Sequence, residues 1–132
     1  MTKHGVSNNA HNSVFRLVNC EQVPYKVREI FLKSQPAFIQ DQNLWRAVVA
    51  TAVLDACGLT GLKRNTNAHN ETIRDAIEWF HFGDDITGEY GPTGSCDLGE
   101  IDSYIVKIMK EEFPLSLIEE LEENERTETS NN

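Results

Sequence analysis

The segment from Leu44 to Cys57 constrains the fold more than any other part of the chain. It contains neither Gly nor Pro, and apolar side chains cover a wide arc of it when it is wound as a helix. Asp41 lies where an N-cap is expected, and Gly58 lies where helices commonly end. A helix that is apolar on so many sides is typical of the centre of a bundle. The residues that we assign to this arc are Leu44, Trp45, Val48, Val49, Thr51, Ala52 and Val53.

Further segments with helical spacing flank this one. The pattern predicts a helix over Tyr25–Ser34, a second from an Asn70 cap to Gly83, and a third from an Asp102 cap to Phe113. Their apolar stripes are formed by Val27, Ile30 and Phe31, by Ile73, Ala76, Ile77 and Phe80, and by Ile105, Ile108 and Met109.

The remaining residues carry only weak strand signals. Residues 84–95 contain three Gly and one Pro and are expected to form a loop with at most a short helical turn at its end. The predicted fold is therefore all-α, a compact bundle of four or five short helices with disordered ends. Its expected core residues are Trp45, Val49, Ile73, Ile77, Trp79, Ile105 and Ile108.

The length of 132 residues suits one domain with polar ends. We expect a flexible N-terminus over residues 1–12, a helical domain over 13–113 and an acidic C-terminal tail over 114–132. No apolar run approaches the roughly 18 residues of a membrane span, and the N-terminus lacks the apolar stretch of a signal peptide. A cytoplasmic protein without a membrane partner is therefore expected.

The net charge of −9 is spread unevenly. Residues 1–64 carry eight Lys/Arg and four Asp/Glu, whereas residues 111–132 carry one Arg and eight Glu. This balance argues against a protein whose whole surface binds phosphate, but it permits a local basic patch. The alternative is a solvated surface that balances the acidic half. The candidates for such a patch are Lys26, Arg28, Lys33, Arg46, Lys63 and Arg64, with Lys63 and Arg64 favoured because they lie in a turn rich in Gly and Asn.

The sequence carries no catalytic or metal-binding pattern. The three cysteines form no C-x-x-C pair, so buried free thiols are expected at Cys20, Cys57 and Cys96. No nucleophile elbow, zinc-protease or P-loop motif occurs. We therefore expect no enzyme activity, no cofactor and no metal. The residues of metal-ligand type that lack a ligand spacing are His69, His81, Asp84, Asp85 and Cys96.

The segment from Ile73 to Val106 suggests a helix-turn-helix. Cys96, Leu98 and Ile101 have the spacing of its packing residues. A recognition helix would then begin near Ser103. The alternative is an ordinary helical hairpin in a small bundle. The recognition helix would expose Ser103, Tyr104, Lys107 and Lys110.

Three stretches of the chain, taken together, resemble a group of small, mostly uncharacterised phage and prophage proteins. They are L-W-R-A-V-V-A-T-A-V-L-D-A at Leu44–Ala56, R-D-A-I-E-W at Arg74–Trp79 and C-D-L-G-E-I-D-S-Y-I at Cys96–Ile105. The resemblance covers roughly residues 44–110 and implies an accessory protein with a helix-turn-helix-like C-terminal half. The last helix of that group carries several arginines, whereas here only Lys107 and Lys110 precede two glutamates.

Three functional hypotheses follow. The first is a non-enzymatic phage or prophage accessory protein that binds DNA or a transcription or replication complex in a regulatory role. If it is encoded by a phage, its compartment is the host cytoplasm. The second is an acidic protein that binds and inhibits a host protein, with DNA mimicry as one route, through an apolar stripe of Leu115, Ile118 and Leu121 among glutamates. The third is a self-assembling structural or packaging component, which would form a homo-oligomer.

Overall fold

The regular secondary structure of the described residues is entirely helical. The computed structural model describes the backbone of residues 5–36 and 39–131 and the side chains of residues 12–36 and 39–123. No strand occurs in these ranges, so the prediction of an all-α fold is confirmed. In chain order the elements are α1 (Gly5–Val18), α2 (Tyr25–Lys33), α3 (Gln40–Ala56), α4 (Asn67–Thr87), the short 3₁₀ helix η2 (Gly88–Tyr90), α5 (Pro92–Leu98), α6 (Tyr104–Glu112) and α7 (Ser116–Asn131).

The described segments contain more helices than the four or five expected, because α1 and α5 are added to those predicted. α1 begins at Gly5, inside the segment 1–12 that was expected to be flexible. Part of that segment, residues 1–4, lies outside the described residues, as does residue 132 at the end of the acidic tail.

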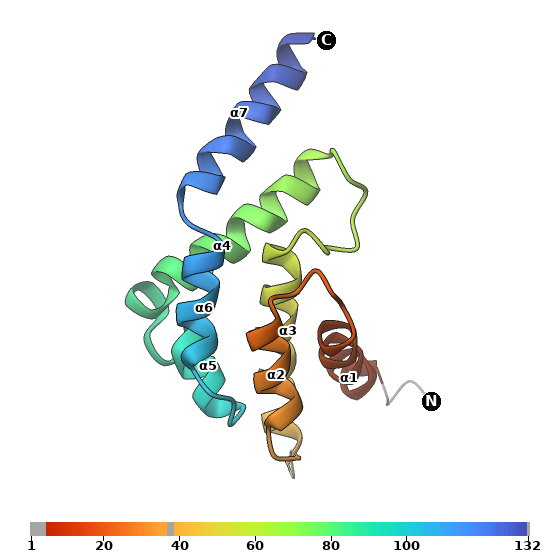
Figure 1. Cartoon of the computed structure of the whole chain (residues 1–132), viewed down its shortest axis with the longest axis vertical. Helices are drawn as coiled ribbons and strands as arrows, with labels where there is room; N and C mark the ends of the chain where they lie inside the picture. Colours follow the sequence, from red (N-terminus) through yellow and green to blue (C-terminus); the bar gives the residue numbers. More distant parts are fainter. Residues whose placement is uncertain (1–4, 37–38, 132) are drawn as a thin grey trace.

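The helix α3 is the centre of the bundle (Figure 1). It contacts α1, α4 and α5, while α2 contacts α1 and α6. α4 crosses the top of α3 in this view and also contacts α6 and α7. Beyond this contact, α7 extends away from the rest of the bundle toward the C-terminus (Figure 1). The described part of the chain contains no helix that is long and apolar enough to span a membrane.

One apolar core joins these helices. Of the expected core residues, Val49, Ile77, Ile105 and Ile108 are buried. Each fully buried side chain of this size contributes roughly 1.5–3 kcal/mol through removal from water. Trp45, Ile73 and Trp79 are only half-buried; Ile73 and Trp79 pack against the edge of this core, whereas the Trp45 ring stacks on that of Tyr90. The largest fully buried side chains are Phe80, Leu17, Ile77, Ile105 and Met109.

The ends of the helices differ from their predicted positions. α3 begins at Gln40, so Asp41 lies in its first turn rather than at the N-cap. There its carboxylate still favours the positive end of the helix dipole. α4 begins before Asn70, because the hydroxyl of Thr66 accepts a hydrogen bond of 3.2 Å from the backbone N–H of His69. Asn70 is therefore not the cap of this helix.

The end of α3 follows the glycine prediction. Gly58 has a φ of +83°, in the left-handed region that glycine tolerates best. Its N–H donates to the carbonyl of Asp55, and the N–H of Leu59 donates to the carbonyl of Leu54. This pair of hydrogen bonds is a Schellman motif, and it satisfies carbonyls that would otherwise be unpaired.

The prediction of a loop over residues 84–95 is wrong. α4 runs through Gly83 to Thr87, and η2 and α5 follow it directly. A Cβ added to Gly91 would lie 2.6 Å from the carbonyl oxygen of Gly83, so these glycines permit close backbone packing rather than a flexible loop. The Asp84 carboxylate fixes the turn, since it accepts hydrogen bonds from both the N–H and the hydroxyl of Thr93 at the start of α5.

Candidate interaction surfaces

The predicted recognition helix corresponds to α6. Tyr104 and Lys107 are exposed on it, whereas Ser103 and Lys110 are half-buried. The Lys107 ammonium lies 5.7 Å from the centroid of the Tyr104 ring, a cation–π distance. Ser103 rather than Asp102 occupies the N-cap position of α6, but the carboxylate of Asp102 still accepts a hydrogen bond of 2.9 Å from the N–H of Tyr104 at the start of the helix.

The packing residues proposed for the helix-turn-helix divide into two groups. Cys96 and Ile101 are buried in the core, and the Ile101 N–H donates to the Cys96 carbonyl across the turn. Leu98 is 42% exposed, so its assignment as a packing residue is wrong. The reason is that it ends the short helix α5 on the side away from the core. The function of the α5–turn–α6 segment in binding DNA stays a prediction.

The surroundings of α6 are acidic. Exposed carboxylates precede it at Glu100 and Asp102 and close it at Glu111 and Glu112. Such groups oppose the approach of a phosphate backbone to Lys107.

The proposed basic patch does not form one surface. Arg46 is buried, and its Nε donates a hydrogen bond of 2.6 Å to the carbonyl of Gly99. Burial lowers the pKa of this guanidinium, while Glu100 opposes that change. Lys33 pairs with Glu29 at 3.6 Å. Arg46 is therefore a structural residue that joins α3 to the turn before α6, and it is not available to an anion.

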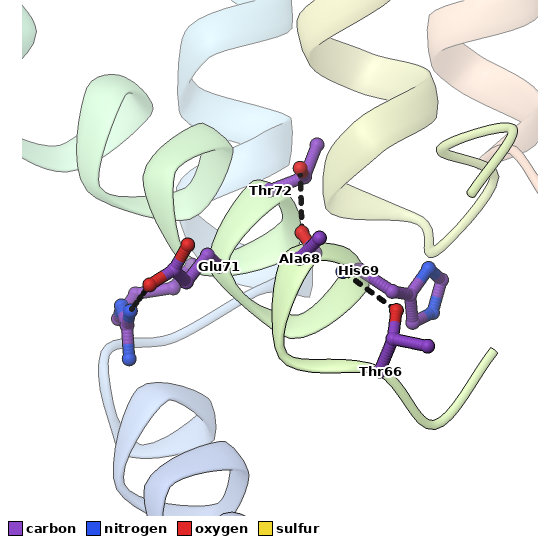
Figure 2. A network of polar contacts seen from close by, with 6 residues as sticks. Thr66, Ala68, His69, Glu71 and Thr72 are labelled. Carbon is purple, nitrogen blue, oxygen red and sulfur yellow. Dashed lines mark hydrogen bonds and ion pairs between the residues drawn. The ribbon is translucent and has the colours of Figure 1, made fainter. Parts of the chain in front are cut away.

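Lys63 and Arg64 are exposed in the segment between α3 and α4. In Figure 1 this segment and α6 lie on different sides of the bundle, so the structure does not bring the two predicted basic sites together. The loop is closed by the hydroxyl of Thr66, which donates to the carbonyl of Lys63 and accepts from the His69 N–H. Figure 2 shows this cap at the start of α4. Because these hydrogen bonds fix the loop, Lys63 and Arg64 lie on a turn of defined conformation.

Three of the candidate metal ligands have other partners. A nitrogen of the His69 ring lies 2.7 Å from the Thr60 hydroxyl, and one of His81 lies 2.8 Å from the carbonyl oxygen of Phe113. Asp84 holds the start of α5, while Asp85 is exposed. The described residues contain no group of three metal-ligand side chains.

The cysteines are free thiols, as predicted, and Cys96 is fully buried. Cys20 and Cys57 are only half-buried. Burial raises the pKa of Cys57 and of Cys96 to about 12, with nearby acidic groups adding to the effect. Both thiols therefore remain protonated near neutral pH and are poor nucleophiles.

The partner-binding stripe predicted in the tail is partly occupied by the bundle itself. Leu115 is exposed, whereas Ile118 and Leu121 are half-buried, and Ile118 packs with Leu117 against the core. The glutamates of α7 at 119, 120 and 123 are exposed. Within the described side chains, ion pairs join only Lys33 to Glu29 and Arg74 to Glu71, so these glutamates have no cationic partner there.

An apolar groove between α3 and α4 is the surface that the sequence did not predict. Leu44 and Val48 lie on the wide apolar arc from which a central helix was predicted, yet they are 43% and 36% exposed. They lie in a groove of about 740 Å³. Its lining residues are Ser13, Leu44, Ala47, Val48, Thr51, Ala52, Asp55, Thr72, Asp75, Ala76 and Trp79.

The groove contains a carboxylate, that of Asp55, whose charged form is disfavoured by burial. Asp55 is half-buried, and burial raises the pKa of its carboxyl to about 6, while the positive charge of Arg16 opposes this rise. One feature of the sequence could have indicated this groove. Asp55 lies on the same helical face as Leu44, Val48 and Thr51 and places a charge at the end of that stripe.

No protein family, curated protein or solved structure matches this chain significantly. The resemblance to small phage and prophage proteins therefore stays a prediction.

Proposed function

We propose that this chain is a non-enzymatic accessory protein that binds a partner protein with a basic surface through its acidic C-terminal half. The observation that carries this proposal is the row of exposed glutamates on α7, which have no cationic partner among the described side chains. α7 also extends away from the bundle, so these charges are accessible to a large partner (Figure 1). A phage or prophage origin would fit a partner in a host transcription or replication complex.

Charge complementarity gives this interaction its speed and selectivity. A field of one sign accelerates encounter with a partner of opposite charge and suppresses encounters with acidic proteins. The exposed Leu115 supplies apolar surface beside the charges, as a lasting complex requires. If the partner is a DNA-binding protein, occupation of its phosphate-binding surface would inhibit it.

The test uses capture from a bacterial lysate by the tagged full chain. We expect one dominant protein, lost in a variant with Glu119→Gln and Glu120→Gln. This variant keeps the contacts of Leu117 and Ile118 with the core, which a truncation of α7 would remove. The matched control has Glu21→Gln and Glu78→Gln, which neutralise two exposed carboxylates elsewhere. Equal capture by both variants, or no dominant protein for the native chain, would refute the proposal.

A second candidate is duplex DNA bound by α6. The observation in its favour is the α5–turn–α6 arrangement with Tyr104 and Lys107 on the exposed side of the second helix. A mobility-shift assay at low salt separates the two functions. A DNA complex that weakens steeply with salt and disappears with Lys107→Glu would support DNA binding, since contacts to phosphates release counterions.

A further inference from the structure

The groove between α3 and α4 lies on the side of α3 opposite the core. Successive residues of a helix turn by about 100°, so the face of Leu44, Val48 and Asp55 points roughly 140° away from the face of Val49 and Val53. Val49 and Val53 are fully buried. The open face is therefore an additional apolar surface, and it is not a defect in the packing of the core.

The groove has two chemically different ends. Along α3, apolar residues come first and Asp55 comes last, and along α4 the acidic Asp75 precedes Ala76 and Trp79. Asp55 is therefore the last α3 residue in the groove and Leu44 the first, and Asp75 adds a second carboxylate from the α4 wall. Among the described residues that line the groove there is no Lys or Arg, although the positive charge of Arg16 acts on Asp55.

We infer that this groove binds an amphipathic helix of a partner protein, with apolar side chains between α3 and α4 and a Lys or Arg beside Asp55 and Asp75. The α3 wall from Leu44 to Asp55 is about 16 Å long at the helical rise per residue. This length fits roughly three turns of a bound helix, whose contacts recur at i, i+3 or i+4 and i+7. Burial of Leu44, Val48 and Trp79 provides affinity, and the carboxylates select the direction and the cation.

The charge of the molecule favours a foreign helix over a second copy of this chain. The chain has a net charge of −9, so two copies repel each other, and its exposed helix α7 is acidic. A cationic helix is attracted both by the whole molecule and by the two carboxylates in the groove. A drug-sized ligand fits less well, because the groove is open along walls where Leu44 and Val48 are partly exposed, whereas such ligands are mostly enclosed.

The groove is separate from the acidic surface of the proposed function, and its test does not depend on that function. The probe is a fluorescent helical peptide of about 18 residues with Leu at i, i+4 and i+7 and Lys at i+11. Its binding to the full chain is measured by anisotropy, beside a peptide with Glu in place of Lys and one with Gln in place of Leu. We expect binding of the Lys peptide and a loss of about ten-fold or more for each altered peptide.

Variants of the chain locate the binding. Val48→Lys places a charge on an exposed position of the groove and should weaken the Lys peptide by about ten-fold or more. The matched control is Leu32→Lys, which changes an exposed leucine on α2 and should leave affinity unchanged. Glu119→Gln with Glu120→Gln should also leave it unchanged.

Several results would overturn the inference. They are absence of binding, equal affinity for the Lys and Glu peptides, and equal losses in the Val48 and Leu32 variants. A loss confined to the α7 variant would place the peptide on α7 and remove it from the groove, while leaving the proposed function intact. A dimer of the chain alone that Val48→Lys abolishes would assign the groove to a second copy and would also refute the inference.

Discussion

Replacement of Asp55 by Asn should stabilise the protein at neutral pH. Burial disfavours the charged form of this carboxyl and raises its pKa from 3.8 to about 6 in the folded chain. Between these values the folded state binds a proton that the unfolded state has already lost. The free energy of unfolding therefore falls as pH rises through this window, and the full penalty is present above pH 6.

The size of the effect follows from the shift. A change of one unit corresponds to about 1.4 kcal/mol, so the shift from 3.8 to about 6 would give about 3 kcal/mol for a fully buried group. Asp55 is only half-buried, and solvent screening reduces this figure. Asn also loses the attraction of Arg16. We therefore expect Asp55→Asn to gain about 1–2 kcal/mol near pH 7.

Urea denaturation followed by tryptophan fluorescence, from about pH 4 to pH 7, measures the difference between variant and native chain. The gain should be largest near pH 7 and small near pH 4, where the folded carboxyl is protonated and the unfolded one is close to its own pKa of 3.8. The control is Asp75→Asn, at an exposed position of the same groove, which should change stability by less than about 0.5 kcal/mol. A gain that is the same at every pH, or a loss near pH 7, would refute the reasoning.

Three further substitutions test the fold by the same denaturation assay. Phe80→Ala empties the position of the largest fully buried side chain and should lower the free energy of unfolding by about 3–5 kcal/mol; a loss below about 1 kcal/mol would contradict the assigned core. Thr66→Ala removes the cap that accepts from the His69 N–H and should cost about 0.5–2 kcal/mol, whereas no loss would place the start of α4 elsewhere. Gly94→Ala would place a Cβ against a backbone carbonyl and should lower the free energy of unfolding by about 1–3 kcal/mol or more. Gly61→Ala is the control and should cost less, because only the φ of +78° opposes the side chain there. A smaller loss at Gly94 than at Gly61 would contradict the close packing of α5.

The sequence predicted the helices that form the core better than the connections between them. Val49, Ile77 and Ile105 follow helical spacing and are buried, because burial of an apolar stripe requires only that some partner lies beside it. The segment of residues 84–95 was wrongly predicted to be a loop. Glycine breaks helices in isolation, but here its lack of a side chain lets two backbones approach, and only the tertiary structure distinguishes these uses.

The candidate sites were harder to predict for the same reason. Arg46 looked like part of a basic surface, yet it is buried against the carbonyl of Gly99. Leu44 and Val48 belong to the wide apolar arc that predicted a central helix, yet they are partly exposed and line the groove. Helical periodicity shows which residues share a face, but the neighbours that cover or leave that face depend on contacts distant in sequence. Cys96 was predicted correctly, since its burial agrees with the habit of its residue type.

The Asp55 carboxylate, whose charged form destabilises the free protein, should strengthen the binding of a cationic helix. A cation beside Asp55 stabilises the charged form of this carboxyl, which burial destabilises. Ionisation of Asp55 therefore strengthens binding of the helix, and binding of the helix favours ionisation by the same free energy. The other charged groups near this position are Arg16 on α1, which already favours ionisation, and Asp75 on α4, which adds negative charge to the groove. Affinity for the Lys peptide should therefore fall as pH is lowered from about 7 to about 5, and this dependence should be largely lost in Asp55→Asn. If instead the native chain and this variant weaken in parallel, the titrating group lies on another surface and the cation does not bind beside Asp55.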